Sequence, residues 1–169
     1  ELAEALTAGA ADAKAPVILQ ISENAVKYHG SLEPIALATL AIARASQFPV
    51  AVHLDHAESV ELIHEAVDLG FTSVMFDGST LDYDANVALT AELAAYCHER
   101  GVGIEAELGE VGGKDGVHAP GVRTNPQEAA AFVAATGVDA LAVAVGSSHA
   151  MTSRDAVLDL ELISEIRDA

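Results

Sequence analysis

The residues with the clearest chemical potential lie where short apolar stretches end. Asp55 and His56 directly follow the stretch VAVHL, Glu107 closes GIEAE, and His149 follows ALAVAV and a Gly-Ser-Ser turn. Imidazole nitrogens and carboxylate oxygens are zinc ligands, and a catalytic zinc site keeps one position open. If these stretches are parallel strands, His56, Glu107 and His149 can converge on one ion at the edge where the strands end. His149 taken alone fits an ordinary hydrogen-bonded residue equally well, whereas His56, next to Asp55, fits that interpretation less well.

Two aspartates stand beside these candidate ligands. Asp55 precedes His56, and an acid next to a metal is the natural proton donor or acceptor. Asp77 follows the apolar stretch SVMF. It could orient a metal ligand, be a ligand itself, or cap the following turn. Glu105 and Glu107 are two residues apart, so both face one side of a strand, which is costly without a cation or hydrogen bonds.

Two further segments are candidates for proton transfer and for phosphate binding. The glycine-rich residues 109–116 form either a loop that closes over a site or a plain surface turn, and Asp115 or Glu110 could carry a proton there. Backbone N–H groups and hydroxyls suit a phosphate. The sequence offers them after the last apolar stretch, with Ser22 as a further contributor, in Gly146, Ser147 and Ser148.

The elements that must position these residues alternate regularly along the chain. Strands are predicted over residues 17–21, 50–54, 73–76, 103–107 and 140–145. Helices are predicted over residues 1–13, from Ser31 through 46, and over 60–69, 82–100, 126–136 and 156–167. Strands that alternate with helices and are apolar on both faces indicate βα units around a parallel sheet. Such sheets carry their active sites at the carboxyl ends of the strands.

Helix boundaries are marked by capping residues. Ser31, Ser59 and Asn125 are predicted N-caps, and Pro126 suits the first position of its helix. Gly70 and Gly137 are predicted to end two helices in the left-handed conformation. The sequence has no G-x-G-x-x-G after its first strand and no phosphate-binding P-loop, which disfavours a nucleotide-binding sheet.

Composition limits the kinds of partner. The 169 residues suffice for a single domain over 1–169, and the net charge of −18 repels nucleic acid and anionic membranes. One cysteine, Cys97, excludes an intrachain disulfide and fits a reducing cytoplasm. No apolar stretch reaches the length that spans a bilayer. We therefore expect a cytoplasmic protein that binds neither nucleic acid nor membranes.

Four motifs together resemble one known family. These are HLDH at 53–56, MFDGS at 75–79, EAELGEVGG at 105–113 and TGVDALAVAVGSSH at 136–149. In this order they resemble the class II, zinc-dependent ketose-bisphosphate aldolases. The resemblance implies a (β/α)8 TIM barrel whose first strand and last two strands are absent from this sequence. It also implies reversible cleavage of a ketose 1,6-bisphosphate, fructose 1,6-bisphosphate above all, to dihydroxyacetone phosphate and glyceraldehyde 3-phosphate.

The same resemblance implies roles for individual residues. His56 and His149 match two of the three zinc-binding histidines, and Asp77 and Glu107 match carboxylates around an alternative metal position. Asp55 matches the acid/base that acts on the C4 hydroxyl, and Asp115 the loop base at C3. Substrate contacts are implied for Gln20 and Ser22. The resemblance further implies Zn²⁺ as the cofactor and allows a second divalent or a monovalent cation. It also implies a phosphorylated sugar as the substrate and assembly into homodimers or homotetramers.

Three departures keep other functions open. We expect the third zinc histidine to lie beyond Ala169, Ala150 follows His149 where many relatives have glycine, and Lys114 and Asp115 replace an acidic pair. A metal-dependent hydrolase would use His56, Glu107 and His149 around an activated water. A non-catalytic relative, kept for assembly or binding, is the third alternative.

Overall fold

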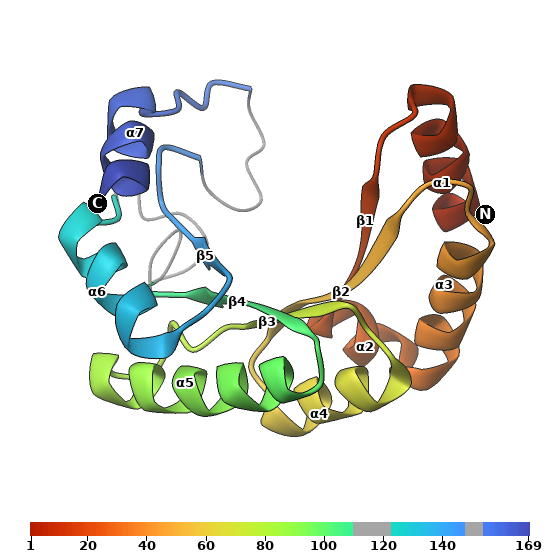
Figure 1. The fold of residues 1–169 in the computed structure, drawn as a ribbon, viewed down its shortest axis with the longest axis horizontal. Helices are drawn as coiled ribbons and strands as arrows, with labels where there is room; N and C mark the ends of the chain where they lie inside the picture. Colours follow the sequence, from red (N-terminus) through yellow and green to blue (C-terminus); the bar gives the residue numbers. More distant parts are fainter. Residues whose placement is uncertain (110–122, 148–153) are drawn as a thin grey trace. The chain divides into compact units, whose positions relative to one another are not determined.

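A computed structural model describes residues 1–109, 123–147 and 154–169 (Figure 1). The chain divides into two compact units. The first unit comprises residues 1–76 and 96–104, and the second comprises residues 77–95 and 105–169. The strands are β1 (Val17–Ser22), β2 (Val50–Ala57), β3 (Ser73–Phe76), β4 (Gly103–Glu107) and β5 (Ala140–Ala142). The helices are α1 (Leu2–Ala13), α2 (Glu23–His29), α3 (Glu33–Ala45), α4 (Val60–Leu69), α5 (Tyr83–Glu99), α6 (Pro126–Thr136) and α7 (Leu160–Asp168).

The strands form one sheet in chain order, β1-β2-β3-β4-β5. β1 pairs with β2, β2 with β3, and β4 with β5, all in parallel. Parallel neighbours require a crossover connection, and here helices supply it. The alternation predicted from the sequence is therefore confirmed, and so is the fold class of a partial (β/α)8 barrel.

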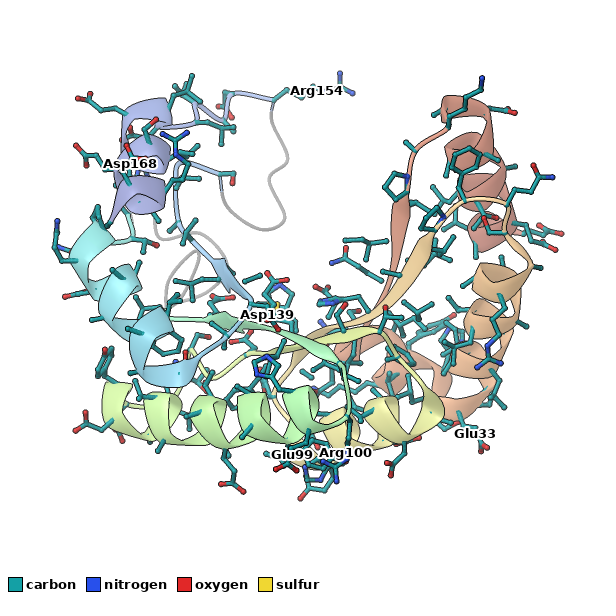
Figure 2. The ribbon with its side chains drawn as sticks, viewed as in Figure 1. Glu33, Glu99, Arg100, Asp139, Arg154 and Asp168 are labelled. Carbon is teal, nitrogen blue, oxygen red and sulfur yellow. The ribbon has the colours of Figure 1, made fainter. Side chains whose placement is uncertain are left out.

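The first unit packs helices against β1, β2 and β3. Its core contains side chains that are at most 4 % exposed on all three strands, among them Leu19, Leu54 and Val74. Helices α3 and α4 both contact β2, and their buried faces include Leu40 and Ile63. The charged residues labelled in this part of Figure 2, Glu33, Glu99 and Arg100, extend away from the strands. The strands are thus enclosed by apolar side chains, as a parallel sheet requires.

The second unit contains the end of β4, β5, α6, α7 and most of α5. α6 contacts α7, and Phe132 on α6 and Leu93 on α5 are both almost fully buried. Asn125 caps α6 through hydrogen bonds from the backbone N–H groups of Gln127 and Glu128 at 2.9 and 3.1 Å. This helix begins where the sequence predicts, because cap, proline and apolar face all agree.

Two predicted elements at the C-terminal end are shorter than expected. β5 ends at Ala142 rather than at residue 145. The backbone groups beyond it bond to loops instead of a neighbouring strand, since Thr124 N donates to Ala144 O and Asp159 N donates to Val145 O. α7 begins at Leu160 rather than at residue 156, and the Asp159 side chain caps it through Leu162 N. Apolarity alone did not reveal either boundary.

Two predictions near the N-terminus also need correction. Ser31 is not the cap of α3, because Leu32 occupies the N-cap position and no side chain caps the helix there. Pro34 fits the first turn, where its missing N–H has no partner to lose. The short helix α2 was not predicted, although Ser22 caps it by accepting a hydrogen bond from Ala25 N at 3.2 Å.

The hydropathy of the helices bears on membrane insertion. Among the described residues, none of the helices combines the length and apolar character that crossing a bilayer demands.

Candidate functional site

β2 contains the whole HLDH motif. The sequence predicted a strand over 50–54 that ends before Asp55, but β2 continues to Ala57. The pairing with β3 shifts register between Leu54 and Ala57, which marks a bulge. His56 lies in this bulge with a φ of 48°, a left-handed conformation that is uncommon outside glycine. A bulge breaks the strict alternation of side chains along a strand. The side chains of Asp55 and His56 therefore need not point to opposite faces of the sheet.

The end of β1 meets Asp55 directly. Gln20 pairs with His53 and Ser22 with Asp55 in the register of the two strands. The Gln20 amide Nε2 donates a hydrogen bond to Asp55 Oδ1 at 3.4 Å. This bond orients the half-buried carboxylate. The hydroxyl of Ser22 accepts the capping hydrogen bond of α2. The substrate contacts expected of Gln20 and Ser22 remain predictions.

His53 is a buried residue of the motif that the sequence did not single out. It is 5 % exposed, and its Nδ1 lies 2.8 Å from the Ser73 hydroxyl on β3. Burial lowers the pKa of the His53 imidazole; the Asp55 charge raises it in part, and His56 lowers it further. His53 is therefore neutral at pH 7 and links β2 to β3 just before the bulge. A histidine within an otherwise apolar stretch was the sequence signal that could have identified it.

In the second unit, two predicted carboxylates lie close together. An oxygen of Asp77 and an oxygen of Glu107 lie within 4.8 Å of each other. Glu107 is 3 % exposed, and Asp77 is half-buried. The Ser79 N–H and hydroxyl donate to Asp77 Oδ1 at 3.2 and 2.5 Å, which confirms that Asp77 also caps the turn after β3. The structure thus brings the two residues together at the ends of β3 and β4.

This pair of carboxylates fits a divalent cation. Two like charges so close, one of them buried, repel each other unless a cation or a proton lies between them. Carboxylate oxygens are accepted ligands of zinc. His56 belongs to the first unit, and its coordination of the same ion remains a prediction. His149, the second predicted histidine ligand, lies outside the described residues.

A buried polar network on α5 holds the backbone of Glu107. Asn86 on α5 is 1 % exposed, and its Nδ2 donates to the backbone oxygen of Glu107 at 3.0 Å. Thr90, fully buried one turn further along α5, donates from its hydroxyl to Asn86 Oδ1 at 2.9 Å. Buried amides with satisfied hydrogen bonds fix a backbone position firmly. Asn86 was missed because a single polar residue in an alanine-rich helix carries no sequence signal of its own.

The predicted phosphate segment begins in a tightly held turn. Gly146 has a φ of 120°, and a Cβ built there would lie 2.2 Å from the Val157 carbonyl oxygen. The preceding Ala144 is fixed by two bonds with Thr124, one from Thr124 N at 3.0 Å and one to Thr124 Oγ1 at 2.8 Å. Ser147 is exposed. Ser148, together with the proposed loop base Asp115, lies outside the described residues.

A cavity of about 200 Å³ lies within the second unit beside this turn. Its lining includes Tyr83, Leu108, Arg123 and Thr124. The Arg123 guanidinium lies 3.9 Å from the Asp159 carboxylate, and both side chains are about 40 % exposed, so this ion pair contributes little stability.

Parallel βα units with a pair of carboxylates at the carboxyl ends of the strands define an α/β protein of the barrel type, and this pair fits a divalent cation. The profile of the family described as "Fructose-bisphosphate aldolase class-II" matches residues 1–169. The chain therefore belongs to the class II fructose-bisphosphate aldolase family. This finding confirms the resemblance seen in the four sequence motifs.

Individual relatives agree with this assignment. The chain is 47 % identical over 137 residues to a fructose-bisphosphate aldolase of Giardia intestinalis, which covers 80 % of this chain and 42 % of the relative. It is 40 % identical over 172 residues to the fructose-bisphosphate aldolase of Geobacillus stearothermophilus, covering 99 % and 60 %. The crystal structure of the YdjI aldolase from Escherichia coli K12 matches with a TM-score of 0.84 and 34 % identity, covering 98 % and 58 %. The chain thus spans between 42 % and 60 % of the length of these relatives.

Proposed function

We propose that the protein containing this chain is a metal-dependent aldolase that cleaves a ketose 1,6-bisphosphate, with fructose 1,6-bisphosphate as first candidate. The products are dihydroxyacetone phosphate and glyceraldehyde 3-phosphate. The observation that carries the proposal is the match of the class II aldolase family over residues 1–169. The names of the relatives from Giardia and Geobacillus support the same substrate class.

The proposed metal is zinc, and four residues of this chain are its candidate ligands. His56, His149, Glu107 and Asp77 supply the nitrogen and oxygen donors that zinc accepts. When bound, zinc acts as a Lewis acid that polarises the substrate ketone. The proximity of Asp77 and Glu107 within 4.8 Å supports the carboxylate part of this ligand set.

Two carboxylates of the chain are proposed to move protons. Asp55 takes the proton of the C4 hydroxyl while the C3–C4 bond breaks; C4 becomes the aldehyde carbon, and the electron pair remains on C3. Asp115 then donates a proton to C3, which completes dihydroxyacetone phosphate. Gln20 donates a hydrogen bond to Asp55 and keeps its carboxylate oriented for this transfer. The phosphates are assigned to the turn of Gly146, Ser147 and Ser148, with Ser22 as a further contact.

The test is a coupled assay for dihydroxyacetone phosphate with the full-length protein. We expect turnover that EDTA abolishes and zinc restores. Asp55→Asn should lower kcat by about 100-fold or more, the range for loss of a general acid or base. Asp12→Asn, which changes an exposed aspartate on α1, is the matched control and should leave kcat unchanged.

Three outcomes would reject the proposal. No triose phosphate from fructose or tagatose bisphosphate in the presence of zinc would exclude the lyase. Release of inorganic phosphate instead would support a hydrolase on the same residues. A folded protein without bound metal and without turnover would support the non-catalytic relative. Sedimentation velocity tests the proposed homodimer or homotetramer.

A further inference from the structure

Glu23, the first residue of α2, makes a set of long-range contacts that the proposed reaction does not yet use. The residue is 9 % exposed. Its Oε2 accepts hydrogen bonds from the backbone N–H groups of Glu58 at 2.7 Å and Ser59 at 3.3 Å. Its Oε1 forms an ion pair with Lys27 Nζ at 2.8 Å. One carboxylate therefore ties α2 to a segment 35 residues further along the chain.

The segment that Glu23 holds directly follows the HLDH motif. Glu58 and Ser59 come after the last residue of β2, Ala57, and Ser59 is the N-cap of α4. The bulge with His56 in its left-handed conformation lies immediately upstream. Such a conformation persists only when the surrounding structure fixes it.

The bulge is fixed on both sides, and Glu23 is the fixing group on the downstream side. Upstream, Leu54 pairs with Val74 and His53 contacts the Ser73 hydroxyl. Downstream, Ala57 pairs with Phe76, and the next two amides are held by Glu23. Asp55 and His56 therefore lie between two anchors, all within the first unit.

The charge of Glu23 strengthens this anchor. Burial alone would raise the pKa of the Glu23 carboxyl, but the bonds from Lys27 and from the Glu58 and Ser59 amides outweigh it and lower the pKa. The carboxylate is therefore ionised at neutral pH. Hydrogen bonds to a charged acceptor are about twice as strong as those between neutral groups.

We propose that Glu23 is a positioning residue for the aldolase site, because it holds the backbone that aims Asp55 and His56. The inference rests on the proposed function. It predicts that loss of the anchor lowers kcat more than it changes the KM for the bisphosphate.

The experiment compares three variants of the full-length protein loaded with zinc. Glu23→Ala removes both backbone bonds and should lower kcat by about 10-fold or more, since small misplacements of catalytic groups cost up to about 100-fold, while KM changes by less than about 3-fold. Glu23→Gln keeps an oxygen acceptor of the same reach and should recover most of kcat. Lys27→Met is the matched control; it removes the exposed partner of the ion pair and should leave kcat within about 2-fold of wild type.

Two readouts are independent of turnover. Hydrogen exchange at the Glu58 and Ser59 amides should accelerate by about 10-fold or more in Glu23→Ala, because local opening becomes easier. Transfer of zinc to a chelator should be faster in the same variant. If the wild type shows no cleavage, the proposed function fails, while exchange and zinc transfer still decide whether Glu23 holds this segment.

The proposal is overturned if Glu23→Ala exchanges faster and melts lower but keeps the kcat and zinc release of the wild type, because Glu23 would then be a cap of α4 alone. If Glu23→Ala does not fold, Glu23→Asp takes its place, since it keeps the charge and shortens the reach. A kcat for Glu23→Asp equal to that of the wild type would also overturn the proposal.

Discussion

Gly146→Ala tests whether the turn after β5 is as closely packed as the structure shows. Two separate effects of the new methyl group destabilise the folded variant. The φ of 120° disfavours any L side chain, and the Cβ would lie 2.2 Å from the Val157 carbonyl oxygen. Because that oxygen belongs to the backbone, the segment around residue 157 must move. The movement threatens the hydrogen bond from Asp159 N to Val145 O, now 2.8 Å long.

The expected loss of stability follows from these two costs. A left-handed or similarly strained backbone costs about 1–2 kcal/mol for a residue with a Cβ. Overpacking against a fixed neighbour costs about 1–3 kcal/mol more. We therefore expect Gly146→Ala to lower the free energy of unfolding by about 3 kcal/mol, and to raise the KM for the bisphosphate if the turn binds phosphate.

Two other glycines separate the contributions. Gly137 has a φ of 72° and nothing within 4 Å of a built Cβ, so Gly137→Ala should show the backbone cost alone, about 1 kcal/mol. Gly109 has neither a positive φ nor a close neighbour, and Gly109→Ala should be nearly neutral. Urea unfolding of the full-length variants measures all three free energies. Equal losses for Gly146→Ala and Gly137→Ala would refute the close contact with Val157.

Four further predictions concern the buried polar groups and one helix cap. Asn86→Ala removes the donor to the Glu107 backbone oxygen and should cost about 2–4 kcal/mol in urea unfolding, because it leaves buried polar groups and a cavity. Glu107→Gln should stabilise the metal-free protein, since it removes one of two charges within 4.8 Å, yet weaken zinc binding by at least about 10-fold in a chelator competition. The lowered pKa of the buried His53 means that the unfolded state binds the proton more readily. Stability should therefore fall as the pH drops below the usual histidine value of 6.5, and His53→Asn should reduce that fall in melts between about pH 7 and pH 5. Ser59→Ala removes the capping bond from Leu62 N and should cost about 1 kcal/mol, and a neutral result in thermal melts would contradict the cap.

The sequence predicted those parts of the fold that depend on local chemistry. Ser59 and Asn125 begin α4 and α6 where their side chains predicted, and Gly70 and Gly137 end the same helices with φ values of 97° and 72°. Caps depend on groups within three or four residues, so a short window contains the whole cause.

Elements that depend on distant partners were predicted less well. The apolar run 140–145 looked like a full strand, but Thr124 and Asp159 bond its last residues and end β5 early. The bulge at His56 was also missed, because it contains no glycine and arises from the pairing of β2 with β3.

The candidate site shows the same division. The placing of Gln20 near Asp55 follows from parallel register between two strands, which the sequence pattern could anticipate in outline. Glu23 and Asn86 act through backbone groups far along the chain, and no spacing of residue types signals such contacts. The carboxylates of Asp77 and Glu107 were predicted from strand ends, and their proximity agrees with that reasoning.

The bulge in β2 limits how this motif can be transplanted by protein design. The letters His-Leu-Asp-His grafted onto a regular strand would alternate, and Asp55 and His56 would then project from opposite faces. A designer must copy the extra residue as well, together with the left-handed backbone at His56 and the two anchors that flank it. The functional unit to be transferred is therefore β2 together with β3 and α2, and not the four-residue motif alone.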